Sequence, residues 1–139
     1  MMVPKKVNDN LSTTFNLGVV YANLSEDDWH GEITKAGFSK EMRESRKTGR
    51  RAELDIFNVW VKFLTETGMP TFLIYKPVVS QAENSRFIQL LKEFNISFDD
   101  DGQIDVSKMI GQKVIATIKN SEDQMGMKYS NIHSLKKVD

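Results

Sequence analysis

The chain has 139 residues, of which 40% are hydrophobic and 27% are charged, and its 19 basic residues balance 19 acidic ones. This length suits one domain with a modest core, and no apolar run approaches the roughly 20 residues that span a bilayer. The lack of cysteine excludes disulfides, thiolate zinc sites and cysteine nucleophiles. The basic start has no apolar segment after it, so we expect a reduced, cytoplasmic protein without a secretory signal.

The basic residues are unevenly distributed along the chain. Six of them lie between Lys40 and Arg51 beside only Glu41 and Glu44, so this stretch carries a charge of +4. Acidic runs at 26–28 and 99–101 offset part of it. A zero net charge is therefore compatible with a basic surface that binds a polyanion.

The first half of the chain predicts strands. Residues 1–13 are polar and aperiodic and predict a loosely held arm before a single domain over 14–139, and the role of 15–21 stays open. A first strand is expected over 29–38, where the glycines suit a bulge or a sharp bend. A basic loop over 40–51 follows, and then the clearest strand, over 52–64.

Period two divides the strand over 52–64 into two faces. One face holds Phe57, Val59, Val61 and Phe63, which we expect in the core. The other mixes apolar, amide, indole and ammonium groups, and its members are Ile56, Asn58, Trp60 and Lys62. Such a mixture is typical of a contact surface. A hairpin loop over 65–68 and a third strand over 71–76 complete this half.

The second half begins with a predicted helix. Ser80 and Glu83 form a capping box, and an apolar stripe runs from Phe87 to Phe94. An acidic turn over 99–103, a helical turn over 105–111 and strands over 113–119 and 127–135 follow. This β-β-β-α-β-β order predicts a mainly β domain, a five-stranded OB-like barrel with one capping α-helix between strands three and four. A five-stranded antiparallel sheet packed on one helix is the alternative.

The closing part of the chain has a familiar pattern. A helical turn from Asp105 ends in Gly111 and Lys113, a strand follows, and a polar loop leads to a last strand with Asn131-Ile132. This pattern resembles small single-stranded-DNA-binding proteins of the OB-fold type from phages and mobile elements. The first half of the chain agrees in outline, because it has a strand, then a loop ending in Gly49-Arg50, and then a long strand. The likeness therefore covers roughly residues 28 to 137.

The resemblance implies a non-catalytic, sequence-independent binder of single-stranded DNA in phage or mobile-element replication or recombination. It further implies a homo-oligomer in the host cytoplasm, with replication or recombination proteins as partners. The acidic, flexible C-terminal tail of bacterial single-stranded-DNA-binding proteins is missing here. The chain ends Lys136-Lys137-Val138-Asp139, so the resemblance does not imply that partners are recruited through such a tail.

Binding a single strand requires cations for the phosphates and flat side chains on which bases stack. The basic loop supplies the cations, and Trp60 is the best stacking platform. The predicted DNA-binding residues are Lys35, Lys40, Arg43, Arg46, Lys47, Arg50, Arg51, Asn58, Trp60, Lys62, Tyr75, Lys128 and Tyr129. The alternative is that the basic loop is only a solvated surface and that the aromatic residues pack in the core. Trp29 is expected to be such a packed anchor.

No catalytic or metal-binding pattern is found, and we expect no enzyme activity, cofactor or metal. The only histidines, His30 and His133, have no ligand spacing, and neither a nucleophile elbow nor a phosphate-binding loop occurs. Aligned to a calcium loop, the acidic turn places Lys108 at the position of the bidentate glutamate. Two other functions stay open: a protein–protein module docking on host or replication machinery, and, with least support, a small nuclease.

Overall fold

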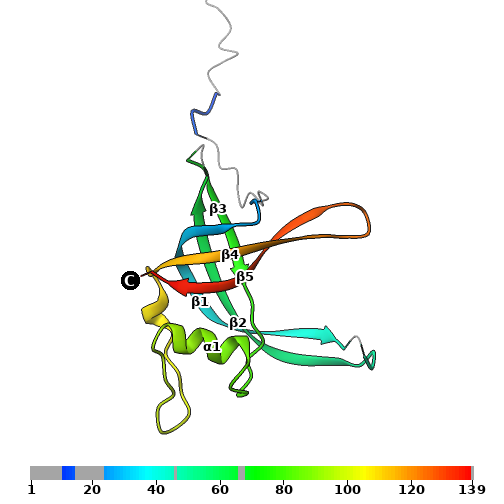
Figure 1. Ribbon diagram of the computed structural model, residues 1–139, viewed down its shortest axis with the longest axis vertical. Helices are drawn as coiled ribbons and strands as arrows, with labels where there is room; N and C mark the ends of the chain where they lie inside the picture. The colour runs from blue at the N-terminus through cyan, green and yellow to red at the C-terminus, as the bar shows by residue number, and fades with distance from the viewer. Residues whose placement is uncertain (1–10, 15–23, 46, 66–67, 139) are drawn as a thin grey trace, which may run out of the picture.

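The computed structural model describes residues 11–14, 24–45, 47–65 and 68–138 (Figure 1). The segment 15–21 and most of the expected N-terminal arm lie outside these residues. The predicted element order is confirmed. The elements are β1 (Asp28–Glu44), β2 (Arg51–Leu64), β3 (Pro70–Tyr75), α1 (Arg86–Glu93), the 3-10 helix η1 (Ser107–Met109), β4 (Lys113–Glu122) and β5 (Lys128–Lys137).

All five strands form one antiparallel sheet in the order β3-β2-β1-β4-β5. The central strand β1 pairs with β4 through residues 28–32 and with β2 through residues 32–44. The sheet curls until Cα atoms of its edge strands, β3 and β5, come within 8 Å of each other. No ladder joins these two strands in the described residues, so the sheet is open.

Strand β1 is irregular between its two glycines, Gly31 and Gly37. A bulge lies between Ile33 and Lys35. At Gly31, an added Cβ would lie 2.7 Å from Val61 Cγ1 and 3.0 Å from the carbonyl oxygen of Lys62. Only glycine therefore lets the two strands approach this closely.

The core lies inside the curled sheet, where alternation predicted it. Phe57, Val59, Val61 and Phe63 are fully buried. The α1 helix lies across one end of the sheet (Figure 1) and adds Phe87, whose ring meets Phe57 edge-on at 5.7 Å. Trp29 packs against the core as a partly buried residue, as expected, and its Nε1 donates to the Ser25 carbonyl oxygen. No helix in the described part of the chain is long and apolar enough to cross a membrane.

The predicted start of the helix at Ser80 is wrong. The N-cap is Ser85, whose Oγ accepts from the Ile88 amide at 3.1 Å, whereas Ser80 Oγ accepts from the Ala82 amide in a local turn. The segment 81–86 offers no large apolar side chain that could bury a further turn. Helical stability in proteins comes mainly from packing an apolar face, so α1 forms only where the apolar stripe meets the core.

The basic loop predicted over 40–51 is largely a β-hairpin. Strand β1 continues to Glu44, β2 begins at Arg51, and the Ser45 amide donates to the Arg50 carbonyl oxygen across the turn. We call residues 39–55 the β1–β2 arm and residues 119–131 the β4–β5 arm. Both arms project from the same side of the sheet (Figure 1). In the β1–β2 arm, opposite charges face each other across the two strands. These pairs stabilise strand pairing where the sequence predicted a charged loop.

Candidate nucleic-acid interface

Trp60 lies half-buried on the face of the sheet opposite the core. We call this surface of β1, β2 and β3 the outer face. Lys35 in β1 and Ile74 in β3 are the direct cross-strand neighbours of Trp60. The ammonium group of Lys35 lies 5.8 Å from the centroid of the Trp60 ring, within the range of a cation–π contact. An aromatic surface and a cation are therefore adjacent here.

A second aromatic residue continues this surface. Lys62 faces Phe72 in β3 and Glu32 in β1, and Glu32 in turn forms a 3.5 Å ion pair with Lys113 of β4. Phe72 is half-buried and is a diagonal neighbour of Trp60, a relationship that spans about 7–8 Å in antiparallel sheets. Phe72 is not among the binding residues predicted from the sequence.

Asn58 is fixed at the base of the β1–β2 arm. Its Nδ2 donates to Ser39 Oγ at 2.8 Å, which leaves the amide oxygen without a hydrogen bond to any described residue. The residue directly opposite is Gly37, where an added Cβ would meet no atom within 4 Å. The outer face therefore has an open position next to Asn58 and Trp60.

Tyr75 is a correction to the predicted site. Its side chain is only 6% exposed and belongs to the core, and burial raises the pKa of its hydroxyl. Alternation along β3 places Thr71, Leu73 and Tyr75 on the core side and Phe72 and Ile74 on the outer face. A base cannot stack on a buried ring, so Phe72 replaces Tyr75 in the candidate interface.

Two of the predicted basic contacts are already paired with acids. Lys40 lies 3.5 Å from Glu53 and 3.8 Å from Asp55, on the face of the β1–β2 arm that does not carry Trp60. On the outer face, Arg43 lies 3.3 Å from Glu41. Glu41 also accepts from Lys76 Nζ, and this hydrogen bond is the main cause that lowers the pKa of the Glu41 carboxyl.

The cations near the tip of the β1–β2 arm are available. Lys47, Arg50 and Arg51 are exposed and form no ion pair with any residue in the described part of the chain. Arg46 lies outside the described residues. The basic stretch therefore presents its unpaired charges at the tip and its paired charges nearer the sheet.

The β4–β5 arm carries the remaining candidates. Lys128 and Tyr129 are exposed, and the Tyr129 hydroxyl donates to Asp123 Oδ2 at 3.1 Å. This bond raises the pKa of Tyr129. Hydrogen bonds from the backbone amides of Met127 and Met125 and from the Tyr129 hydroxyl lower the pKa of Asp123. Both candidates are accessible, but they lie on a different arm from the outer-face group.

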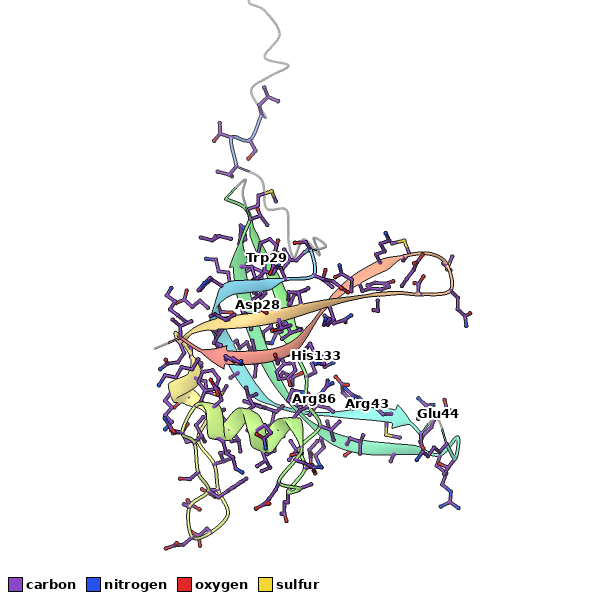
Figure 2. The ribbon with its side chains drawn as sticks, viewed as in Figure 1. Asp28, Trp29, Arg43, Glu44, Arg86 and His133 are labelled. Atoms are coloured by element: carbon purple, nitrogen blue, oxygen red, sulfur yellow. The ribbon has the colours of Figure 1, made fainter. Side chains whose placement is uncertain are left out.

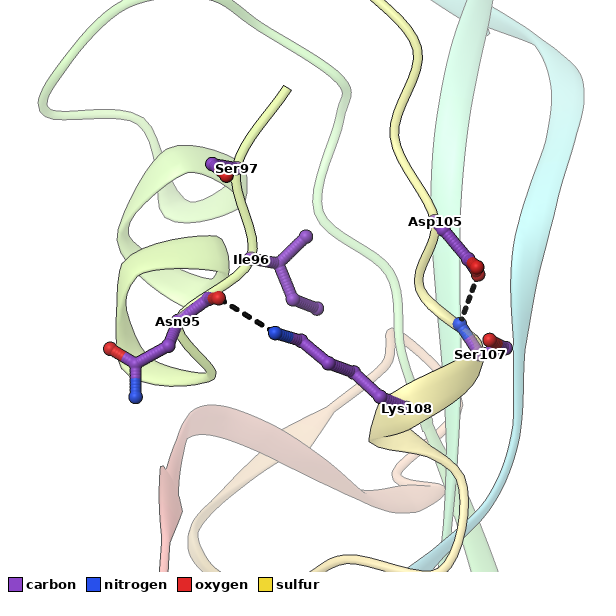
Figure 3. A pocket seen from close by; sticks show the side chains of 6 residues that line it. All are labelled: Asn95, Ile96, Ser97, Asp105, Ser107 and Lys108. Carbon is purple, nitrogen blue, oxygen red and sulfur yellow. Dashed lines mark hydrogen bonds between the residues drawn. The ribbon is translucent and has the colours of Figure 1, made fainter. Parts of the chain in front are cut away.

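The first carboxylate of the acidic turn bonds to the backbone of the turn. Asp99 Oδ1 accepts from the backbone amides of Asp101 and Gln103, so it stabilises the turn itself. Figure 3 shows the neighbouring recess, where Lys108 Nζ donates to the Asn95 carbonyl oxygen at 2.8 Å and Asp105 accepts from the Ser107 amide. No group of three acidic, histidine or cysteine residues that could hold a metal ion occurs in the described residues.

The structure thus brings four predicted residues together on the outer face: Lys35, Asn58, Trp60 and Lys62. Arg43 lies further along the same face, whereas Arg51, near the tip of the arm, lies by alternation on the opposite face. The chain matches no family model, no curated protein and no solved structure.

Proposed function

We propose that the protein binds single-stranded DNA, without sequence preference and without catalysis, on the outer face of β1, β2 and β3. The observation that carries the proposal is the half-exposed Trp60 ring, which lies between Lys35 and Ile74. Phe72 and Lys62 continue the same combination of aromatic and cationic groups. This combination suits a single strand because its bases are free to stack and its phosphates need cations.

The energetic contributions are of two kinds. Base stacking on an aromatic side chain contributes about 1–3 kcal/mol per base and depends little on the identity of the base. Phosphate contacts release counterions, so the affinity falls as salt rises. Trp60 and Phe72 supply the first contribution, and Lys35, Lys62 and the tip cations supply the second.

The bound DNA runs from Phe72 and Lys62 past Trp60 and Asn58 onto the β1–β2 arm. From Trp60 to Arg51 the path follows nine residues of β2, which is about 30 Å at 3.3 Å per residue. We further propose that β3 and β5 complete a partly open OB-type barrel. In that fold the same face, together with the loops between strands one and two and between strands four and five, binds oligonucleotides.

The resemblance of the sequence extends the proposal to a biological role. The protein acts in the DNA replication or recombination of a phage or mobile element, as a homo-oligomer in the host cytoplasm. Replication or recombination proteins are its partners in this role.

A protein–protein module is the second candidate function. The observation that favours it is the exposed apolar surface near the tip of the β4–β5 arm, where Met125 is 89% and Met127 58% exposed. Such side chains are common at adaptable binding surfaces. Because this arm is distinct from the outer face, the two functions require different residues.

The proposal is tested by the fluorescence anisotropy of labelled oligo(dT) titrated with the native protein at low salt. Saturable binding is expected, with weaker binding to the corresponding duplex and a reduced affinity for Trp60→Ala. Met125→Ser is the matched control on the other arm and keeps the native affinity. If the folded native protein does not bind at low salt, the proposal is wrong and the protein-partner function gains support.

A further inference from the structure

A recess lies between β3, α1 and β5, on the core side of β3 and away from the outer face. Its volume is about 330 Å³, and Tyr75, Arg86, Glu93, His133 and Lys136 are among its lining residues. Figure 2 shows Arg86, at the start of α1, beside His133 of β5. Three elements that are distant in sequence thus contribute polar side chains to one concave place.

The hydroxyl of Tyr75 is without a partner in this recess. The residue is more than nine-tenths buried, and no hydrogen bond joins its hydroxyl to any described residue. Among the described residues, no unpartnered side-chain nitrogen or oxygen is sealed away from solvent. The Tyr75 hydroxyl therefore opens into the recess, where it can donate a hydrogen bond to a ligand.

The charged groups around this hydroxyl are mainly positive. Arg86 and Lys136 form no ion pair with any residue that the structure describes. Glu93 is the one acidic lining residue, and its Oε1 accepts from the Lys137 amide at 3.0 Å. His133 adds an imidazole that can donate. The recess therefore combines two unpaired cations with two further donors.

We propose that this recess binds a phosphate group. A phosphate has several acceptor oxygens around one centre, and it suits a site that converges an arginine fork, an ammonium group and neutral donors. Arg86 and Lys136 supply the charge, and Tyr75 and His133 supply further hydrogen-bond donors. The site is distinct from the outer face because Tyr75 and Ile74 lie on opposite faces of β3. The proposal does not depend on the DNA-binding function.

The experiment is a titration of the full chain with inorganic phosphate at constant ionic strength, followed by backbone amide NMR. Shifts are expected to saturate and to cluster at residues 75, 86 and 133–136. Arg86→Gln weakens binding about tenfold, as expected for the loss of a charge-assisted hydrogen bond, and Tyr75→Phe weakens it less. Lys92→Gln, an exposed cation on α1 outside the recess, keeps the native affinity.

Two results would overturn the proposal: shifts spread over lysines of the whole surface, or Arg86→Gln binding phosphate as well as the native protein. Trp60→Ala should leave phosphate binding unchanged, so failure of this site and failure of the outer face are distinguishable. A second titration identifies the source of the phosphate. If a 5′-phosphate on a thymidine dinucleotide tightens binding only when Arg86 is present, the source is the end of a DNA strand. If the dinucleotide binds equally with and without its 5′-phosphate, the source is free phosphate.

Discussion

Lys35 and Trp60 face each other across the β1–β2 ladder, with Lys35 Nζ 5.8 Å from the ring centroid. A cation–π contact at an exposed site contributes about 0.5–1 kcal/mol. Its larger consequence is positional, because it holds a cation for the phosphate next to the ring on which a base would stack.

Replacing Lys35 should weaken DNA binding with little effect on the fold. In Lys35→Gln, the affinity for oligo(dT) is expected to fall several-fold at low salt, and the slope of log K against log salt to decrease by about 0.7, as for one lost phosphate contact. Anisotropy titrations at several salt concentrations measure both. Lys92→Gln on α1 is the matched control. An unchanged slope in Lys35→Gln would show that Lys35 does not contact phosphate.

The two glycines of β1 should respond in opposite ways to alanine. Gly31→Ala places a Cβ 2.7 Å from Val61 Cγ1 and 3.0 Å from a backbone oxygen, and we expect a loss of about 1–3 kcal/mol in the free energy of unfolding. At Gly37 the added Cβ meets no atom within 4 Å. Gly37→Ala is therefore neutral or stabilising by up to about 1 kcal/mol. Thermal unfolding followed by circular dichroism compares the two, and equal destabilisation would contradict the packing described for Gly31.

Gly37 also offers a way to block the outer face without unfolding the protein. Gly37→Val adds a β-branched side chain opposite Asn58 in a strand, where such residues are favoured. Stability is expected to be maintained while the affinity for oligo(dT) falls, because the branched side chain occupies the open position next to Trp60. Native affinity for oligo(dT) in the folded variant would indicate that the DNA does not pass over this position.

The tip cations should control the salt dependence more than the paired cations do. Replacing Lys47, Arg50 and Arg51 together by Gln is expected to decrease the slope of log K against log salt by about 2, at about 0.7 per phosphate contact. The matched control replaces Lys40 and Arg43, which are already paired with Glu53, Asp55 and Glu41. In this control, the slope of log K against log salt should change less per replaced residue. A larger change in the control would mean that DNA displaces these ion pairs.

The turn of the β4–β5 arm should loosen in acid. The native pKa of Asp123 is lowered by hydrogen bonds from Met127 and Met125, so its stabilisation is present above the unfolded pKa of about 3.9 and is lost as pH falls through the native value. The amide shifts of Met125 and Met127 are expected to titrate together with a midpoint below 3.9, and Asp123→Ala should abolish the transition. A midpoint at or above the unfolded value would contradict this role.

Alternation predicted β2 well because one period runs through a long strand. It placed Phe57 and Val61 in the core and Trp60 on the opposite face, and the structure confirms both. Ile56 is an exception: its register places it on the outer face, but it is fully buried beside Val78 and so does not belong to a contact surface. Applied to β3, the same rule would have selected Phe72 rather than Tyr75. The choice of Tyr75 followed the chemistry of its side chain and ignored its position.

Features that depend on packing between distant segments were not predictable from local patterns. The N-cap of the helix is Ser85 rather than Ser80, because the helix forms where Phe87 can pack against Phe57. The β1–β2 arm is a pair of strands rather than a loop because cross-strand pairs such as Lys40 with Glu53 stabilise charged residues in a ladder. Likewise, the approach of β3 to β5 and the recess between them bring together residues about 60 positions apart.

The most direct test of the outer face uses tryptophan fluorescence, since the chain has only two tryptophans, Trp29 and Trp60. In Trp29→Phe, Trp60 is the only indole, and Phe keeps an aromatic ring packed against the core. Titration with oligo(dT) should quench this fluorescence to saturation, with weaker binding at high salt, while Trp60→Phe shows no quenching. If the folded Trp29→Phe protein shows no response at low salt, or if Trp60→Phe is quenched equally, Trp60 is not the stacking platform and the central claim is wrong.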